Sequence, residues 1–170
     1  MLPKSYIVAK WSVYALATFL LIVLQHLVLN HISLWGVTPF LYPMLPALVA
    51  SYEGLQQGSK FALVMGIFCD LLLPAPFEGF YTVLFTLIGI LAGLIGENLL
   101  SPGWLCGFTV SAMGLGLVVV ARLLLYLLSG ELRPLLMGYI ALTEVAITLP
   151  AMLVAFPIYR WIHSRCATDY

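Results

Sequence analysis

Charged side chains are almost missing from six long apolar stretches of this chain, and this feature most restricts how it can fold. The chain has 170 residues, of which 63% are hydrophobic and 8% are charged. A soluble domain has about 25% charged residues, so this chain has too few to cover a surface that faces water. The stretches also lack the strict alternation of a transmembrane barrel. The sequence therefore predicts an all-α membrane protein.

The apolar stretches predict six transmembrane helices, because about 20 apolar residues cross a bilayer. The second stretch is short and carries Pro39, Pro43 and Pro46, which remove backbone donors, so we expect a short irregular helix packed against protein. The sixth contains Pro150 and Pro157, which predict a kink. The connections are short, so residues 1–170 are expected to form a single polytopic domain. The predicted spans are about 11–29, 39–52, 61–73, 79–96, 104–129 and 135–161.

Basic residues outside the spans are unevenly distributed between the two sides. Six spans place both termini on one side, and a cytoplasmic N-terminus leaves Arg133 as the only loop cation outside. Residues 11–29 are too long for a cleaved signal peptide, so they are expected to remain as the first span. The positive-inside rule then predicts cytoplasmic termini. The cations expected inside are Lys4, Lys10, Lys60, Arg160 and Arg165, and the tryptophans expected at span ends are Trp11, Trp35, Trp104 and Trp161.

Several function classes have no support in the sequence. Cys69, Cys106 and Cys166 are an odd number without CxxC spacing, which favours packing or a free thiol over a disulfide or a metal site. Seven basic and seven acidic residues form no basic patch for nucleic acid. No serine or histidine is placed to complete a nucleophile with its base. We therefore expect no catalytic residue, no metal and no cofactor.

Three ionisable residues lie inside the predicted spans: Asp70, Arg122 and Glu144. An ionised group in hydrocarbon costs several kcal/mol unless it is paired. The expected depths of the three overlap, so Arg122 is predicted to pair with Asp70 or Glu144 in an interhelical ion pair that fixes packing. A ligand site or proton path, and snorkelling to the outer interface, are the alternatives.

Small residues and a proline-rich turn mark the middle of the chain. Gly89 and Gly93, with Gly96 offset by three, let a helix approach its neighbour closely, either inside the protein or at a partner-binding face. The turn 74–79 contains two prolines and ends in Gly79, so it is expected to be rigid. It serves either as a hairpin connection or as a docking element.

The pattern formed by Gly58, Gly66, Asp70, Pro76 and Gly79 resembles the signature region G…GxxxDxxxxxPxG of the MreD family, the rod shape-determining membrane proteins of bacteria. The proline-rich second span, the following Gly-rich helix, the length and the hydropathy are also similar. The chain departs from the pattern by Glu78 directly before Gly79, which leaves two residues between Pro76 and Gly79 where the pattern has one, and by an added Pro74.

The resemblance implies a protein of the bacterial cytoplasmic membrane without catalytic activity. It implies binding to MreC and a place in the elongation complex, which also contains MreB, RodA and a penicillin-binding transpeptidase, so that the protein regulates cell shape and peptidoglycan synthesis.

A second reading is the substrate-binding S component of an energy-coupling-factor vitamin transporter, which is similar in size and span number. An S-component-like bundle is therefore the expected architecture in both cases. An S component needs a cavity with convergent polar groups near the outer face, where this chain offers few polar residues. An intramembrane enzyme is disfavoured because no catalytic constellation is present.

Overall fold

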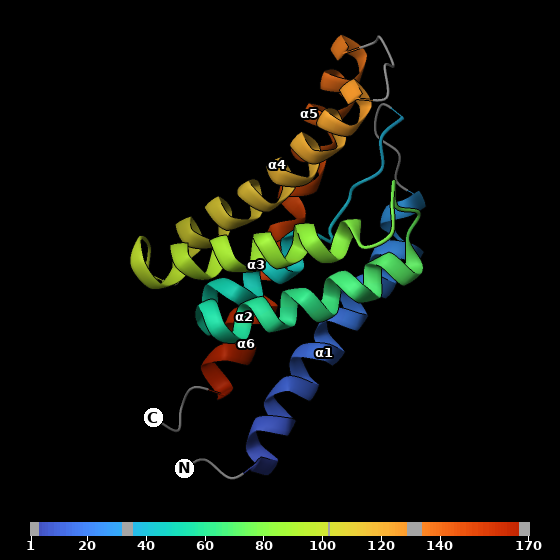
Figure 1. The fold of residues 1–170 in the computed structure, drawn as a ribbon. Coiled ribbons are helices and arrows are strands. Elements are labelled where there is room, and N and C mark those ends of the chain that lie inside the picture. Colours follow the sequence, from blue (N-terminus) through green and yellow to red (C-terminus); the bar gives the residue numbers. More distant parts are fainter. Residues whose placement is uncertain (1–3, 32–35, 102, 129–133, 167–170) are drawn as a thin grey trace.

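The computed structural model describes residues 4–31, 36–101, 103–128 and 134–166, and the regular elements in this part of the chain are helices (Figure 1). Two short 3-10 turns, η1 (Leu29–His31) and η2 (Leu149–Ala151), accompany the α-helices. The α-helices are α1 (Lys4–Leu27), α2 (Met44–Leu72), α3 (Phe80–Asn98), α4 (Trp104–Leu128), α5 (Pro134–Thr148) and α6 (Met152–Cys166).

Four helical stretches in the described part are long and apolar enough to cross a membrane. The last of them joins α5, η2 and α6 into one element. These stretches agree with the prediction of an all-α membrane protein, whose lipid-facing side chains are apolar. Their bounds are Val8–Leu27, Phe80–Asn98, Trp104–Leu128 and Gly138–Arg165.

The prediction of six transmembrane helices is not supported, and the difference lies in the second and third spans. The sequence predicts spans at 39–52 and 61–73 with a polar connection between them, whereas the structure has the single element α2. Only Gly54 leaves the helical conformation inside it, with φ 77° and ψ −179°. The ten residues before Gly54 rise about 15 Å, half of a bilayer core of about 30 Å. The part after Gly54 carries Lys60 and Asp70.

Gly54 folds α2 back on itself. Residues eight apart in an unbroken helix are separated by about 12 Å along its axis. Here a Cβ atom added to Gly58 would overlap Ala50, so the residues on the two sides of Gly54 are in direct contact. The second half of α2 then lies antiparallel to α3 (Figure 1). The bend therefore converts one helical element into two packed segments.

The segment 39–43 before α2 is mostly buried and is not helical, whereas the sequence predicts an irregular helix that starts at residue 39. Helix α2 begins only at Met44 and contains Pro46 in its first turn. Gln25 of α1 is only 2% exposed, and its side-chain amide forms hydrogen bonds with the backbone of this segment. Its Nε2 donates to the carbonyl of Pro39 at 2.5 Å, and its Oε1 accepts from the N–H of Leu41 at 3.2 Å. Thr148 Oγ1 accepts from the N–H of Phe40 at 3.0 Å. Side chains thus replace the helical hydrogen bonds that an extended apolar segment lacks.

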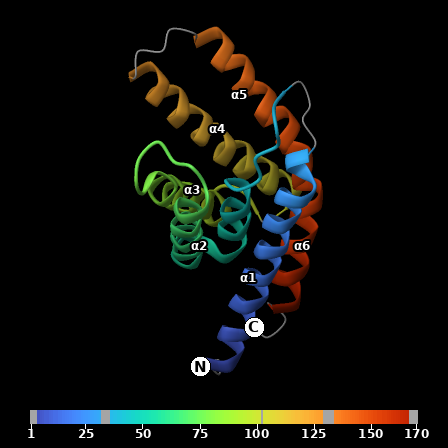
Figure 2. The ribbon, with the colours of Figure 1, turned by 90° about the vertical axis from the view of Figure 1, so that its right-hand side faces the viewer.

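Helices α1 and α6 lie side by side (Figure 2). Tyr14 of α1 stacks on the fully buried Tyr159 of α6, with ring centroids 6.1 Å apart, and Thr18 shares a hydrogen bond of 2.9 Å with the Tyr159 hydroxyl. The beginning of α1 and the end of α6 are therefore at the same end of the molecule. The predicted kink in the last span is present at Pro150, where η2 interrupts the α-helical hydrogen bonding, while Pro157 lies inside α6.

Candidate functional site

Asp70 lies at the end of α2 and holds the first turn of α3. Its Oδ1 accepts from the N–H of Tyr81 at 2.9 Å, and its Oδ2 accepts from the N–H of Thr82 at 2.9 Å and from the Thr82 hydroxyl at 2.6 Å. The first N–H groups of a helix lack partners within it and carry a partial positive charge. The carboxylate of Asp70 therefore acts as a cap donated by the neighbouring helix.

The other residues of the MreD-like pattern belong to the same hairpin. Gly66 faces the start of α3, where a Cβ would come within 2.8 Å of the carbonyl oxygen of Tyr81. Gly79 directly precedes α3 with φ 83°, a left-handed conformation that favours glycine. Gly58 contacts Ala50 across the bend. The pattern therefore describes how α2 is bent and how it is joined to α3.

Gly89, Gly93 and Gly96 face α2, so the structure places them at an internal helix contact. A Cβ on Gly93 would lie 2.7 Å from the Cα of Leu55, and one on Gly96 would lie 2.5 Å from the carbonyl oxygen of Ser51. A Cβ on Gly89 would overlap Ala62. These contacts use the small residues for packing between α3 and α2, which leaves them covered by this chain itself.

Arg122 of α4 pairs with Glu144 of α5 and not with Asp70. Its Nη1 donates to both carboxylate oxygens of Glu144, at 3.1 and 3.2 Å. The guanidinium also lies 4.6 Å from the ring centroid of Phe40. The side chains of Arg122 and Glu144 are 29% and 14% exposed. The structure therefore selects one of the two pairings that the sequence left open, because Asp70 already serves α3.

A cavity of about 710 Å³ lies beside this ion pair. The turn after α2 contributes Pro74 and Pro76, and α4 contributes Arg122 and Tyr126. Phe40 and Tyr81 complete its aromatic lining. The sequence predicts few convergent polar groups here, and in the described part of the lining Arg122 is the charged one.

Glu53, at the bend of α2, is the centre of a buried polar cluster that the sequence analysis missed. Its carboxylate accepts from the Tyr14 hydroxyl at 2.8 Å, and its side chain is only 6% exposed. Lys10 Nζ lies 2.5 Å from Oε2, and His163 Nδ1 lies 3.2 Å from Oε1. Helices α1, α2 and α6 therefore meet at one carboxylate.

The electrostatics of Glu53 reflect these contacts. Burial acts to raise the pKa of the carboxyl, but the hydrogen bonds of His163, Lys10 and Tyr14 outweigh it and lower the pKa to about 2. The carboxylate is consequently ionised and paired at neutral pH. A signal for this site exists in the sequence, since Glu53 directly precedes Gly54 and follows an apolar run, but its partners lie 39 or more residues away.

A second carboxylate stabilises the bend from the other side. Glu97, near the end of α3, accepts through Oε1 from the N–H of Leu55 at 2.8 Å. Leu55 is the first residue after Gly54, so its N–H is freed by the change in backbone direction. A side chain at position 54 would overlap the same carboxylate. Position 54 therefore requires glycine, because its φ angle is positive and because the Glu97 carboxylate occupies the space of a side chain.

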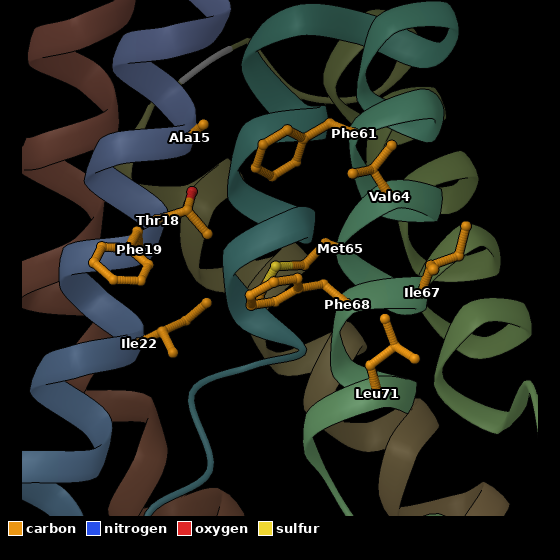
Figure 3. Close-up of a pocket in the computed structure, with 10 residues that line it drawn as sticks. All are labelled: Ala15, Thr18, Phe19, Ile22, Phe61, Val64, Met65, Ile67, Phe68 and Leu71. Atoms are coloured by element: carbon orange, nitrogen blue, oxygen red, sulfur yellow. The ribbon is translucent and has the colours of Figure 1, made fainter.

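An apolar groove of about 440 Å³ runs between α1 and the second half of α2 (Figure 3). Figure 3 shows side chains of α1 facing those of α2 across it, with Ala15 and Phe61 towards one end and Ile22 and Leu71 towards the other. The groove is lined by Ala15, Thr18, Phe19, Ile22, Phe61, Val64, Met65, Ile67, Phe68 and Leu71.

The two cysteines whose side chains the structure describes are buried. Cys69 and Cys106 are free thiols inside the protein, and the side chain of Cys166 lies outside the described residues. The described residues include no group of three or more histidine, cysteine, aspartate or glutamate side chains that suits a metal ion. Arg133 and Trp35 of the topology prediction also lie outside the described residues.

No family model, characterised protein or solved structure matches this chain. The resemblance to the MreD family therefore rests on the sequence pattern alone.

Proposed function

We propose that this protein is a non-enzymatic membrane scaffold of the bacterial cell-elongation complex, which regulates cell shape and peptidoglycan synthesis by binding an MreC-like membrane protein. The observation that carries the proposal is the role of Asp70. It is the central residue of the MreD-like pattern, and it holds α3 against α2 through Tyr81 and Thr82. The pattern is thus used to build a rigid hairpin, as a scaffold requires.

The cytoplasmic membrane and cytoplasmic termini are part of the proposal. Lys10 of α1 and His163 of α6 both contact Glu53, so the helices that carry the termini meet at one end. That end also carries Arg160 and Arg165, and the positive-inside rule favours the cytoplasm for it. Fusion of green fluorescent protein to either terminus is expected to fluoresce, whereas alkaline phosphatase fused to either is expected to be inactive. The reverse pattern contradicts this orientation.

Affinity purification from native membranes tests the partner. We expect an MreC-like protein to be recovered, together with RodA, a penicillin-binding transpeptidase and MreB when the membranes are solubilised gently. Asp70→Ala is expected to reduce recovery of the MreC-like protein, while Glu78→Gln, in the exposed turn nearby, is a matched control that keeps it. Recovery of an energising ATPase pair in its place contradicts the proposal.

The S component of a vitamin transporter is the second candidate, and the cavity of about 710 Å³ beside Arg122 favours it. Its aromatic residues and one guanidinium suit an aromatic ligand with an acidic group. Expression in a vitamin auxotroph, with and without an energising module, distinguishes the two functions. Vitamin uptake that Arg122→Gln abolishes supports the transporter and excludes the scaffold as the main role.

A further inference from the structure

We propose that the groove between α1 and α2 is a specific site for one anionic phospholipid, with an acyl chain in the groove and the phosphate at Lys60. This inference goes beyond the scaffold function and does not depend on it. It rests on the shape of the groove, on the kind of side chains that line it and on a cation at one of its ends.

A lipid chain fits the groove better than a helix does. Transmembrane helices associate through small residues that let their backbones approach. In the described lining only Ala15 and Thr18 are small, while Phe19, Phe61 and Phe68 project from the two walls. A helix has a diameter of about 10 Å and cannot enter a space of about 440 Å³ between such side chains. A flexible hydrocarbon chain fills it.

The groove continues into a second cavity that is suited to a headgroup. This cavity of about 300 Å³ shares Ala15, Phe61 and Val64 with the groove and adds Trp11, Gln57 and Lys60. Trp11 stacks on Phe61, with ring centroids 6.1 Å apart, and so lies where the apolar part ends. Indole rings prefer this depth, between hydrocarbon and headgroups.

Lys60 supplies the charge that selects the headgroup. It is exposed, and none of the ion pairs among the described residues involves it. Lysine carries a compact ammonium group that binds phosphate, and its long stem is apolar enough to pack against an acyl chain. The neighbouring side chain Gln57 is neutral, so an anionic lipid such as phosphatidylglycerol is favoured over the zwitterionic phosphatidylcholine.

Native mass spectrometry of the delipidated full chain, titrated with either lipid, tests this site. The wild-type protein is expected to retain one phosphatidylglycerol in preference to phosphatidylcholine. Lys60→Gln is expected to lower that preference about fivefold, the effect of one basic group near an anionic headgroup. Lys60→Arg is expected to retain it. Val64→Trp, at a position 64% exposed, is expected to block binding of both lipids.

Two controls match these variants. Arg160→Gln removes the same charge from an exposed position outside the groove. Leu63→Trp introduces the same side chain as Val64→Trp one residue away, at a position that does not line the groove. Both are expected to bind as the wild type does. Wild-type lipid binding by Val64→Trp overturns the proposal, and so does equal loss of phosphatidylglycerol in Arg160→Gln and Lys60→Gln. If Val64→Trp changes the oligomeric state and leaves lipid binding unchanged, the proposal is also overturned, and the groove is assigned to a second copy of this chain.

Discussion

Two carboxylates at different places in the bundle, Glu53 and Glu144, show how differently this protein stabilises buried charge. Glu53 has three partners from two other helices, and its side chain is 6% exposed. Among the described residues the carboxylate of Glu144 pairs with Arg122 alone, in a contact where the side chains of Glu144 and Arg122 are 14% and 29% exposed. The number of donors and the exclusion of solvent, more than the presence of a salt bridge, decide how much each contributes.

The difference has an architectural cause. Glu53 sits at the bend of α2, where the backbone direction changes at Gly54 and where α1 and α6 converge. The ion pair of Arg122 and Glu144 joins α4 to α5 beside the cavity of about 710 Å³, and the guanidinium packs on Phe40. The Glu53 cluster therefore holds three elements in place, and the Arg122 pair holds two.

The largest effect is expected at Glu53. Glu53→Ala removes the acceptor for Lys10, Tyr14 and His163 and leaves their donors without a carboxylate, so the free energy of unfolding in detergent should fall by about 3 kcal/mol. Denaturant titration measures the change. Tyr14→Phe, which removes one donor only, is expected to lose about 1 kcal/mol. A Glu53→Ala variant as stable as the wild type contradicts the central role of the cluster.

Asp70 is expected to follow. Asp70→Ala deletes three hydrogen bonds at the start of α3, and helix caps and bonds to charged groups contribute about 2 kcal/mol in such a position. Hydrogen exchange should show faster opening of Tyr81 and Thr82 amides in this variant. Thr82→Val keeps both amide contacts and is expected to lose less. Equal protection of these amides in the wild type and in Asp70→Ala argues against the cap.

Arg122→Leu is expected to destabilise the protein by about 1 kcal/mol, because it leaves Glu144 unpaired in a partly solvated position. A double-mutant cycle with Glu144→Gln measures the pair directly. The double variant should be more stable than the sum of the single effects predicts. If Arg122→Leu costs as much as Glu53→Ala, solvent exposure does not distinguish the two sites.

A final test uses acidity in place of a mutation, and it acts on the same carboxylate as Glu53→Ala. The pKa of Glu53 is lowered from 4.5 to about 2 in the folded protein, so its contribution is complete above pH 4.5 and is lost as the pH falls towards 2. The melting temperature of the wild type should therefore decline over this range by more than that of Glu53→Gln, which does not titrate there. Parallel pH profiles for the two proteins contradict the low pKa.

Sequence patterns identify some of the residues in these sites, whereas the partners of those residues depend on tertiary contacts. The sequence pattern around Asp70 predicts the turn between the two helices. The partners of Asp70 are the amides of Tyr81 and Thr82 and the Thr82 hydroxyl, and no sequence signal marks them as its partners. Arg122 and Glu144 are recognisable in the sequence as charges within apolar helices. The structure pairs them with each other, while the carboxylate of Asp70 binds the start of α3. The sequence predicts a polar connection at Glu53, because neither its helical position nor the approach of α1 and α6 can be read from the local sequence.

By itself the sequence determined that this is an all-α membrane protein, that prolines interrupt its last helix, and that Gly89, Gly93 and Gly96 need close neighbours. Apolar composition, proline and missing Cβ atoms act locally, so their consequences are readable along the chain. Only the tertiary structure decided that residues 44–72 form one element bent at Gly54, and that Glu53 and Glu97 meet that bend. Those contacts depend on helices brought together over 39 or more positions, which is a property of packing and not of any one stretch.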